Sequence, residues 1–190
     1  MESKTLLVTG FAPFGGDPVN PSWEAVKALP DVLGGYRLEK CLLPVEFDRA
    51  ARLAIEAAEA VGADAILCVG LAANRSAFTP EAIGVNVRDA RIPDNAGKQP
   101  AGEPIVPDAP AAYFSTLPIR AMAEAIQRAG LPAAVSYSAG TYVCNDLLYS
   151  LLHRFDGSDT RAAFLHVPRM TDSLPPADFV RALCAAIDVI

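Results

Sequence analysis

Short apolar runs alternate with helical stretches along most of the chain, and this alternation constrains the fold more than any other feature. The runs, which are rich in Val, Ile and Leu, occupy residues 4–9, 36–45, 65–69 and 162–167. Such runs are typical of buried strands, and strand, helix and strand in succession predict parallel pairing. We therefore predict an α/β fold, one domain over residues 1–190, built as a three-layer sandwich with a mostly parallel twisted sheet flanked by helices. Helices are expected at residues 21–29, 47–61, 118–130, 144–155 and 175–190, with Asn20 as the N-cap of the first.

The stretch from about residue 71 to residue 117 breaks the alternation. Six prolines punctuate it, and only residues 83–87 resemble a strand. A compact domain rarely carries so long an irregular segment unless it builds a binding site or an interface. Apolar residues such as Ile83 and Tyr113 argue against disorder, so we expect an ordered functional excursion.

Four segments that follow or flank the ends of predicted strands are expected to meet at one edge of the sheet. They are residues 10–16, 70–74, 140–144 and 166–169. Ligands of open α/β sheets bind beyond the carboxyl ends of the strands. The first segment is not a nucleotide motif, because its spacing is not GxGxxG and no Lys-Ser/Thr pair follows it. Its Phe11 and Phe14 instead predict an apolar pocket wall, or simply a plug at the end of the sheet.

Cys144 lies at the start of a predicted helix that follows a short predicted strand, residues 134–137. The free N–H groups and the positive end of the helix dipole favour a thiolate there, although an inert buried cysteine is the alternative. A nucleophilic thiol needs a base, and the chain has 2 histidines. His153 lies more than two turns along the same helix and cannot reach the thiol. His166, at the end of a predicted strand, is therefore the better base.

A third group should orient the imidazole of such a base, and the excursion offers several acids for this role. Glu81, Asp89 and Asp94 all qualify, and their spacing does not choose among them. Arg91 is a candidate to stabilise a developing oxyanion beside the backbone N–H of Cys144. The residues alone thus point to a Cys–His hydrolase.

Composition excludes several other classes of protein. The formal net charge of −6 and the pI near 4.9 argue against nucleic acid and against an anionic membrane as partners. No apolar segment is long enough to span a membrane, and the N-terminus does not resemble a signal peptide. The 4 cysteines are widely spaced without a CxxC pair, which favours free thiols and argues against disulfides or a zinc site. We predict a cytoplasmic protein.

Five stretches of the chain, in order, resemble the pyroglutamyl peptidase I family, the C15 cysteine peptidases. They are Val8-Thr-Gly-Phe-Ala-Pro-Phe-Gly-Gly16 with Asn20-Pro-Ser22, Asp89-Ala-Arg-Ile-Pro-Asp-Asn95, Ala111-Ala-Tyr-Phe-Ser-Thr-Leu-Pro118, Ser138-Ala-Gly-Thr-Tyr-Val-Cys-Asn145 and Leu165-His-Val-Pro168. The resemblance therefore covers nearly the whole chain.

The resemblance implies removal of an N-terminal pyroglutamyl residue from peptides, with no metal and no cofactor. It assigns the nucleophile to Cys144, the base to His166 and the acidic member of the triad to Glu81, and it gives Arg91 a role at the oxyanion. It also implies a homo-oligomer, commonly a tetramer. The implied substrate-binding residues are Phe11, Phe14, Asn20, Leu71, Ile92 and Val143.

Two departures from the family pattern keep other functions open. Leu71 stands where members often carry an amide, and Ala82 follows Glu81 where the family has an arginine, so we expect a neighbouring cation to be missing. A catalytically weak protein that binds a lactam or a nucleoside-like ligand is the alternative function. A phosphorylase-like nucleotide enzyme is a third.

Overall fold

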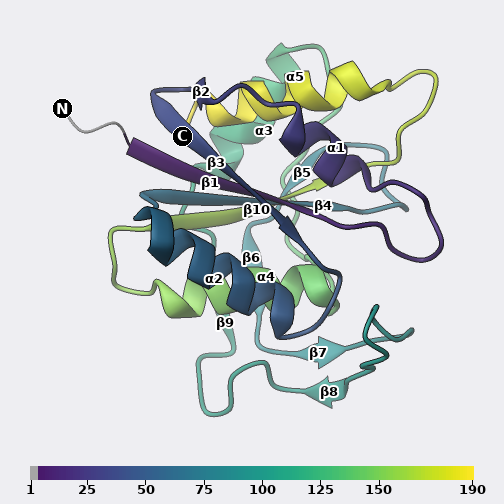
Figure 1. Ribbon diagram of the computed structural model, residues 1–190, viewed down its shortest axis with the longest axis vertical. Coiled ribbons are helices and arrows are strands. Elements are labelled where there is room, and N and C mark those ends of the chain that lie inside the picture. Colours follow the sequence, from purple (N-terminus) through teal and green to yellow (C-terminus); the bar gives the residue numbers. More distant parts are fainter. Residues whose placement is uncertain (1–3) are drawn as a thin grey trace.

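Four parallel strands form the centre of the sheet, in the computed structural model that describes residues 4–190 (Figure 1). The sheet has 6 strands in the order β2-β3-β1-β4-β10-β5, and the short edge strands β2 and β5 run antiparallel to their neighbours. The α/β fold and the mostly parallel sheet are as predicted. The strands of this sheet are β1 (Lys4–Phe11), β2 (Val32–Leu33), β3 (Tyr36–Leu43), β4 (Ala65–Leu71), β5 (Thr79–Pro80) and β10 (Arg161–Val167).

Five helices cover the two faces of the sheet, and each lies within three residues of its predicted bounds. Figure 1 shows α1, α3 and α5 on one face and α2 and α4 on the other. No helix among residues 4–190 combines the length and the apolar character needed to cross a membrane. The helices are α1 (Pro21–Lys27), α2 (Arg49–Val61), α3 (Ile119–Arg128), α4 (Val143–Arg154) and α5 (Pro176–Ile187).

The central strands are apolar throughout because both of their faces are buried. On β4, Leu67 and Val69 pack into the core below α1, α3 and α5, whereas Ile66 and Cys68 pack into the core below α2 and α4. This strict alternation fixes the face on which each following residue lies. Gly70 therefore belongs to the α2/α4 face.

The excursion is ordered, as predicted, but it contains more strands than residues 83–87. It forms two small antiparallel pairs, which Figure 1 shows beside the α2/α4 layer. The Asn145 side chain holds β6 against α4: Oδ1 accepts from Val85 N at 2.9 Å, and Nδ2 donates to Val85 O at 2.8 Å. The pairs join β6 (Ile83–Val85) with β9 (Ala112–Phe114) and β7 (Arg88–Asp89) with β8 (Ala101–Glu103).

The predicted strand at residues 134–137 is wrong, because this segment makes only isolated parallel bridges. Ala134 N donates to Phe78 O at 3.1 Å, and Ser136 N donates to Pro80 O at 2.9 Å. The bond expected between these two would need an N–H group on Pro80, which proline lacks. The ladder is therefore broken at its centre, although the segment still lies beside residues 78–82.

Candidate active site

Cys144 and His166 meet at the carboxyl edge of the sheet. In the pairing of β4 with β10, Gly70 lies opposite His166. A Cβ atom added to Gly70 would lie only 3.2 Å from the Sγ atom of Cys144. The thiol therefore lies over Gly70. The backbone of Gly70 is in turn one strand spacing, about 4.8 Å, from that of His166. Both side chains line a cavity of about 740 Å³ that opens on this edge.

The strand alternation of β10 directs His166 toward the thiol. Phe164, two residues earlier, belongs to the core below α2 and α4, and its ring centroid lies 4.6 Å from that of His166. Cys144 is the second residue of α4 and packs against the same core. His153 is not part of this pair, because its Nδ1 instead lies 3.0 Å from the hydroxyl of Tyr113. The structure thus selects His166 over His153 as the imidazole beside the thiol.

Of the three acids left open by spacing, Glu81 is the one that contacts an imidazole. It follows β5, and its backbone N donates to Phe164 O at 2.8 Å, which brings the side chain beside β10. Its carboxylate is fully buried, and Oε1 lies 2.7 Å from Nδ1 of His166. Asp94 instead caps a turn by accepting from the backbone N of Ala96 at 2.9 Å. Asp89 is exposed.

The expectation that a neighbouring cation is missing is wrong, because Arg75 supplies one. Its Nη1 atom lies 2.5 Å from Oε1 of Glu81, the oxygen that also contacts His166. Its Nη2 atom donates to Ser138 O at 2.8 Å. Ala82 therefore does not leave the carboxylate without a positive partner. Spacing and periodicity do not connect Arg75 with Glu81, because Arg75 lies in an irregular segment six residues before it.

The charges of the site favour an ionised Glu81 beside a neutral His166. Burial alone would raise the pKa of Glu81, but hydrogen bonds from His166, Ser136 and Arg75 bring it below its usual range. Burial lowers the pKa of His166, and the positive charge of Arg75 acts in the same direction, although Glu81 opposes both. A neutral imidazole can donate Nδ1–H to the carboxylate and keep its other nitrogen free to accept a proton.

The prediction that the helix terminus favours a thiolate at Cys144 is wrong for the site as the structure shows it. Burial raises the pKa of Cys144 to about 12, and the nearby negative charge of Glu81 also raises it. Loss of solvation outweighs the helix dipole here. A thiol in this state can act as a nucleophile only if a base takes its proton, and the imidazole of His166 lies beside it.

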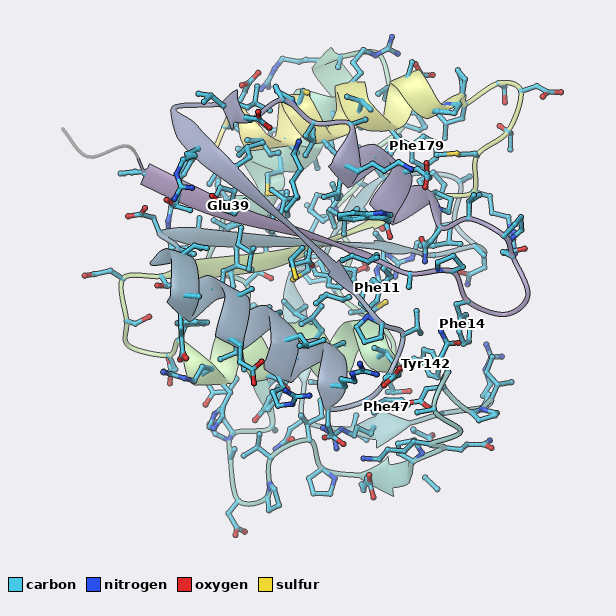
Figure 2. The ribbon with its side chains drawn as sticks, in the orientation of Figure 1. Phe11, Phe14, Glu39, Phe47, Tyr142 and Phe179 are labelled. Carbon is cyan, nitrogen blue, oxygen red and sulfur yellow. The ribbon has the colours of Figure 1, made fainter. Side chains whose placement is uncertain are left out.

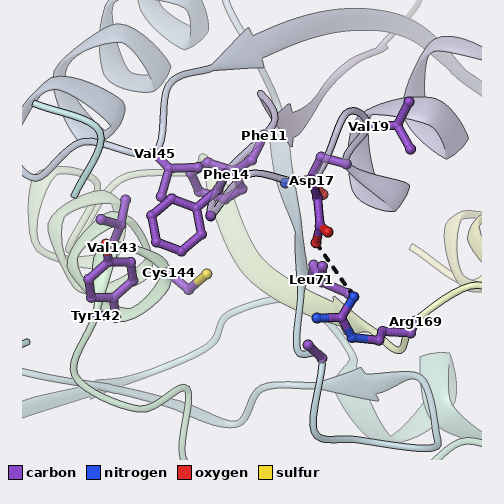
Figure 3. Close-up of a pocket in the computed structure, with 13 residues that line it drawn as sticks. Phe11, Phe14, Asp17, Val19, Val45, Leu71, Tyr142, Val143, Cys144 and Arg169 are labelled. Atoms are coloured by element: carbon purple, nitrogen blue, oxygen red, sulfur yellow. Dashed lines mark hydrogen bonds and ion pairs between the residues drawn. The ribbon is translucent and has the colours of Figure 1, made fainter. Parts of the chain in front are cut away.

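An apolar pocket of about 270 Å³ adjoins the thiol (Figure 3). Figure 2 shows Phe11, Phe14, Phe47 and Tyr142 gathered at one end of the sheet, with Phe179 in the opposite helical layer. The ring centroids of Phe14 and Tyr142 are 5.7 Å apart, so these rings form a continuous aromatic wall. The lining residues named from the sequence are Phe11, Phe14, Asn20, Leu71, Val143 and Cys144.

Two of the predicted substrate-binding residues differ from the expectation. Ile92 is 53% exposed and lines the larger cavity, not the apolar pocket. Asn20 lines the pocket, but its amide is already used: Nδ2 donates to Ala12 O at 3.0 Å, and Oδ1 accepts from Ser22 N at 3.1 Å. Asn20 therefore caps α1, as predicted, and fixes the loop that carries Phe11 and Phe14. Arg91 lines the larger cavity together with Cys144.

The chain matches the family model described as pyroglutamyl peptidase over residues 4–185. It is 45% identical to the pyrrolidone-carboxylate peptidase of Levilactobacillus brevis, over 97% of this chain and 96% of that protein. It is 48% identical to the pyrrolidone-carboxylate peptidase of Escherichia fergusonii, over 87% of this chain and 78% of that protein. The crystal structure of pyroglutamyl peptidase I from Bacillus amyloliquefaciens superimposes with a TM-score of 0.94 at 41% identity, covering 98% of this chain and 96% of that one. The chain belongs to the pyroglutamyl peptidase family.

Within this member of the pyroglutamyl peptidase family, the pocket also has a charged rim that sequence reasoning missed. Arg169 Nη1 lies 3.5 Å from Asp17 Oδ2, and Figure 3 shows this pair with Leu71 across the pocket from the aromatic wall. Tyr142 and Val45 were also missed, although Tyr142 directly precedes the predicted Val143. Within residues 4–190, no cluster of three or more His, Cys, Asp or Glu side chains is arranged to hold a metal ion.

Proposed function

We propose that this protein hydrolyses the amide bond that follows an N-terminal pyroglutamyl residue of a peptide. In this proposal Cys144 is the nucleophile, His166 is the general base and then the general acid, and Glu81 orients the imidazole. The observation that carries the proposal is the arrangement of a thiol beside a histidine whose Nδ1 lies 2.7 Å from a buried carboxylate, next to an apolar pocket. Family membership supports the same activity.

The reaction proceeds in two steps. His166 takes the proton of the Cys144 thiol while sulfur attacks the carbonyl carbon of the pyroglutamyl residue, which forms a tetrahedral oxyanion. That intermediate collapses, the C–N bond breaks, and the leaving amine takes the proton from His166. Water then attacks the thioester, again with His166 as the base, and free pyroglutamate and the thiol are released.

The start of α4 is suited to stabilise the oxyanion. No side chain caps this helix, so its first-turn N–H groups, including that of Cys144, carry no capping acceptor. Backbone N–H groups at a helix N-terminus stabilise developing negative charge. Arg91, which lines the same cavity, adds a positive charge on the open side.

The pocket favours a neutral lactam over an ordinary N-terminus. Aromatic and aliphatic side chains line the wall next to Cys144, so an ammonium group buried against this wall would lose its solvation. A pyroglutamyl ring carries no charge, so it enters without this penalty. Rejection of the charged amine is thus one source of the selectivity.

The backbone of Leu71 offers polar partners for the lactam, which offsets the missing amide side chain. Ala72 N donates to Val167 O at 2.9 Å, so the N–H of Ala72 points toward β10. Successive residues of a strand direct their N–H and C=O to opposite sides, so those of Leu71 point away from β10. On that side the described pairing of β1 with β4 ends at Thr9 and Cys68, before Leu71 is reached. The N–H and C=O of Leu71 are therefore directed toward the gap where the two strands diverge, beside the pocket.

A pyroglutamyl-amide reporter tests the proposal directly. Cys144→Ala and His166→Ala should each abolish turnover, whereas His153→Gln, the matched change at the other histidine, should retain it. Iodoacetamide should inactivate the wild type with labelling at Cys144, and Cys41→Ala should be inactivated equally. Full activity in Cys144→Ala would refute the mechanism. Saturable binding of pyroglutamate without turnover by the wild type would favour the binding protein instead.

We also propose a cytoplasmic homo-oligomer. The four cysteines of residues 4–190 are free thiols, which is compatible with a reducing compartment. Light scattering on the purified protein, together with a thiol titration without reductant, tests the two parts of this proposal separately.

A further inference from the structure

Arg75 holds a position in the site that neither the triad nor the pocket accounts for. Its guanidinium contacts two segments: it reaches the hydroxyl of Thr79 and, at 2.5 Å, Oε1 of Glu81 in residues 79–81, and it donates to Ser138 O at 2.8 Å. Residues 79–81 include the edge strand beside His166 and carry the acid, whereas the segment around Ser138 leads into α4. A single planar donor group thus connects the chain segments around the site.

The carboxylate of Glu81 depends on few donors. Both Arg75 and His166 contact Oε1, and Oε2 has no hydrogen-bond partner among the described residues. Glu81 is fully buried, whereas the side chain of Arg75 is 24% exposed. A buried carboxylate that loses its charged donor is free to rotate about its last torsion or to take up a proton. Either change would alter the direction of the bond to His166.

We propose that Arg75 is a positioning residue, which holds Oε1 of Glu81 against Nδ1 of His166 and thereby aims the imidazole at the thiol of Cys144. This inference rests on the triad of the proposed function. Arg75 also gives the buried site a balanced charge, because its positive charge compensates Glu81 while His166 stays neutral. The imidazole can then act as a base without first losing a proton.

The role predicts a specific kinetic pattern. Arg75→Gln keeps hydrogen-bonding groups but loses the charge and the fork, so kcat should fall by about tenfold to a hundredfold, as for other supporting residues. KM should change little, because Arg75 does not line the apolar pocket. Arg75→Lys keeps the charge, cannot make the same set of bonds, and should lie between the wild type and Arg75→Gln. Arg128→Gln on α3, whose partner is Glu124, is the matched control and should match the wild type.

A proton resonance provides a readout that does not need substrate. The Nδ1–H proton of His166, in its short bond to Glu81, should give a strongly downfield signal, which His166→Gln removes and His153→Gln retains. In Arg75→Gln this signal should move upfield or exchange away while thermal unfolding remains cooperative. An unmoved signal together with unchanged kcat in Arg75→Gln and Arg75→Lys would overturn the proposal. A wild type that shows the signal but does not cleave the reporter would refute the proposed function, while the effect of Arg75 on the signal would still stand.

Discussion

Gly70→Ala tests whether the close contact between β4 and α4 positions the proposed catalytic groups. The added Cβ would lie 2.6 Å from Cζ of Phe164 and 3.2 Å from Sγ of Cys144. To restore ordinary contact at 3.4 Å, the Phe164 ring must move by about 0.8 Å. Phe164 is fully buried, and its centroid lies 4.6 Å from that of His166 and 6.3 Å from that of Phe11. The base and the pocket wall should therefore move with it.

The expected magnitudes follow from this displacement. Overpacking of this kind lowers the free energy of unfolding by about 1–3 kcal/mol, which corresponds to a fall in Tm of about 2–12 °C for a chain of this size. Because a displacement approaching 1 Å costs about a hundredfold in rate, kcat should fall by about that factor. Calorimetry and the reporter assay measure the two effects. The Phe164→Leu background should make Gly70→Ala less costly, since the ring that clashes is gone. A Gly70→Ala enzyme with the Tm and kcat of the wild type would refute the reasoning.

Three further changes test other parts of the site. Leu71→Gln should alter KM by less than about threefold, because the proposed lactam contacts come from backbone; a tenfold fall in KM would contradict this. Asp146→Ala should lower the free energy of unfolding by about 1–3 kcal/mol in chemical denaturation, since it removes the buried partner 2.6 Å from Arg88 Nε while Asp48, 2.5 Å from Arg88 Nη2, still pairs with that arginine. Burial raises the pKa of Cys144 to about 12. In His166→Ala, which lacks the base, the rate of alkylation by iodoacetamide should therefore still increase between pH 9 and pH 10. A plateau below pH 9 would show that the pKa of the thiol is not raised in this way.

The sequence was sufficient for the layers of the fold because both faces of the sheet are buried. Continuous apolar runs such as the one around Leu67 identify a strand without indicating which helix covers which face. The convergence of Cys144 and His166 followed from the rule that ligand sites lie at the carboxyl ends of parallel strands. The strand at residues 134–137 was wrong because its partner is set by tertiary contact, and a proline in that partner interrupts the ladder.

The acidic end of the site lay beyond what spacing can determine. Glu81 reaches His166 only because β5 adds to the sheet as an antiparallel edge of two residues, too short to leave a periodic pattern. Arg75 reaches the same oxygen from a segment with no regular structure, so neither periodicity nor a spacing rule connects it with Glu81. The pKa of Cys144 was misjudged for a related reason: a helix N-terminus is visible in a sequence, but the depth at which it is buried is not. The groups that set the proton affinities in this site are therefore those that only the folded chain brings together. Substitutions at Arg75 should accordingly change the rate of the chemical step while leaving the apolar pocket intact.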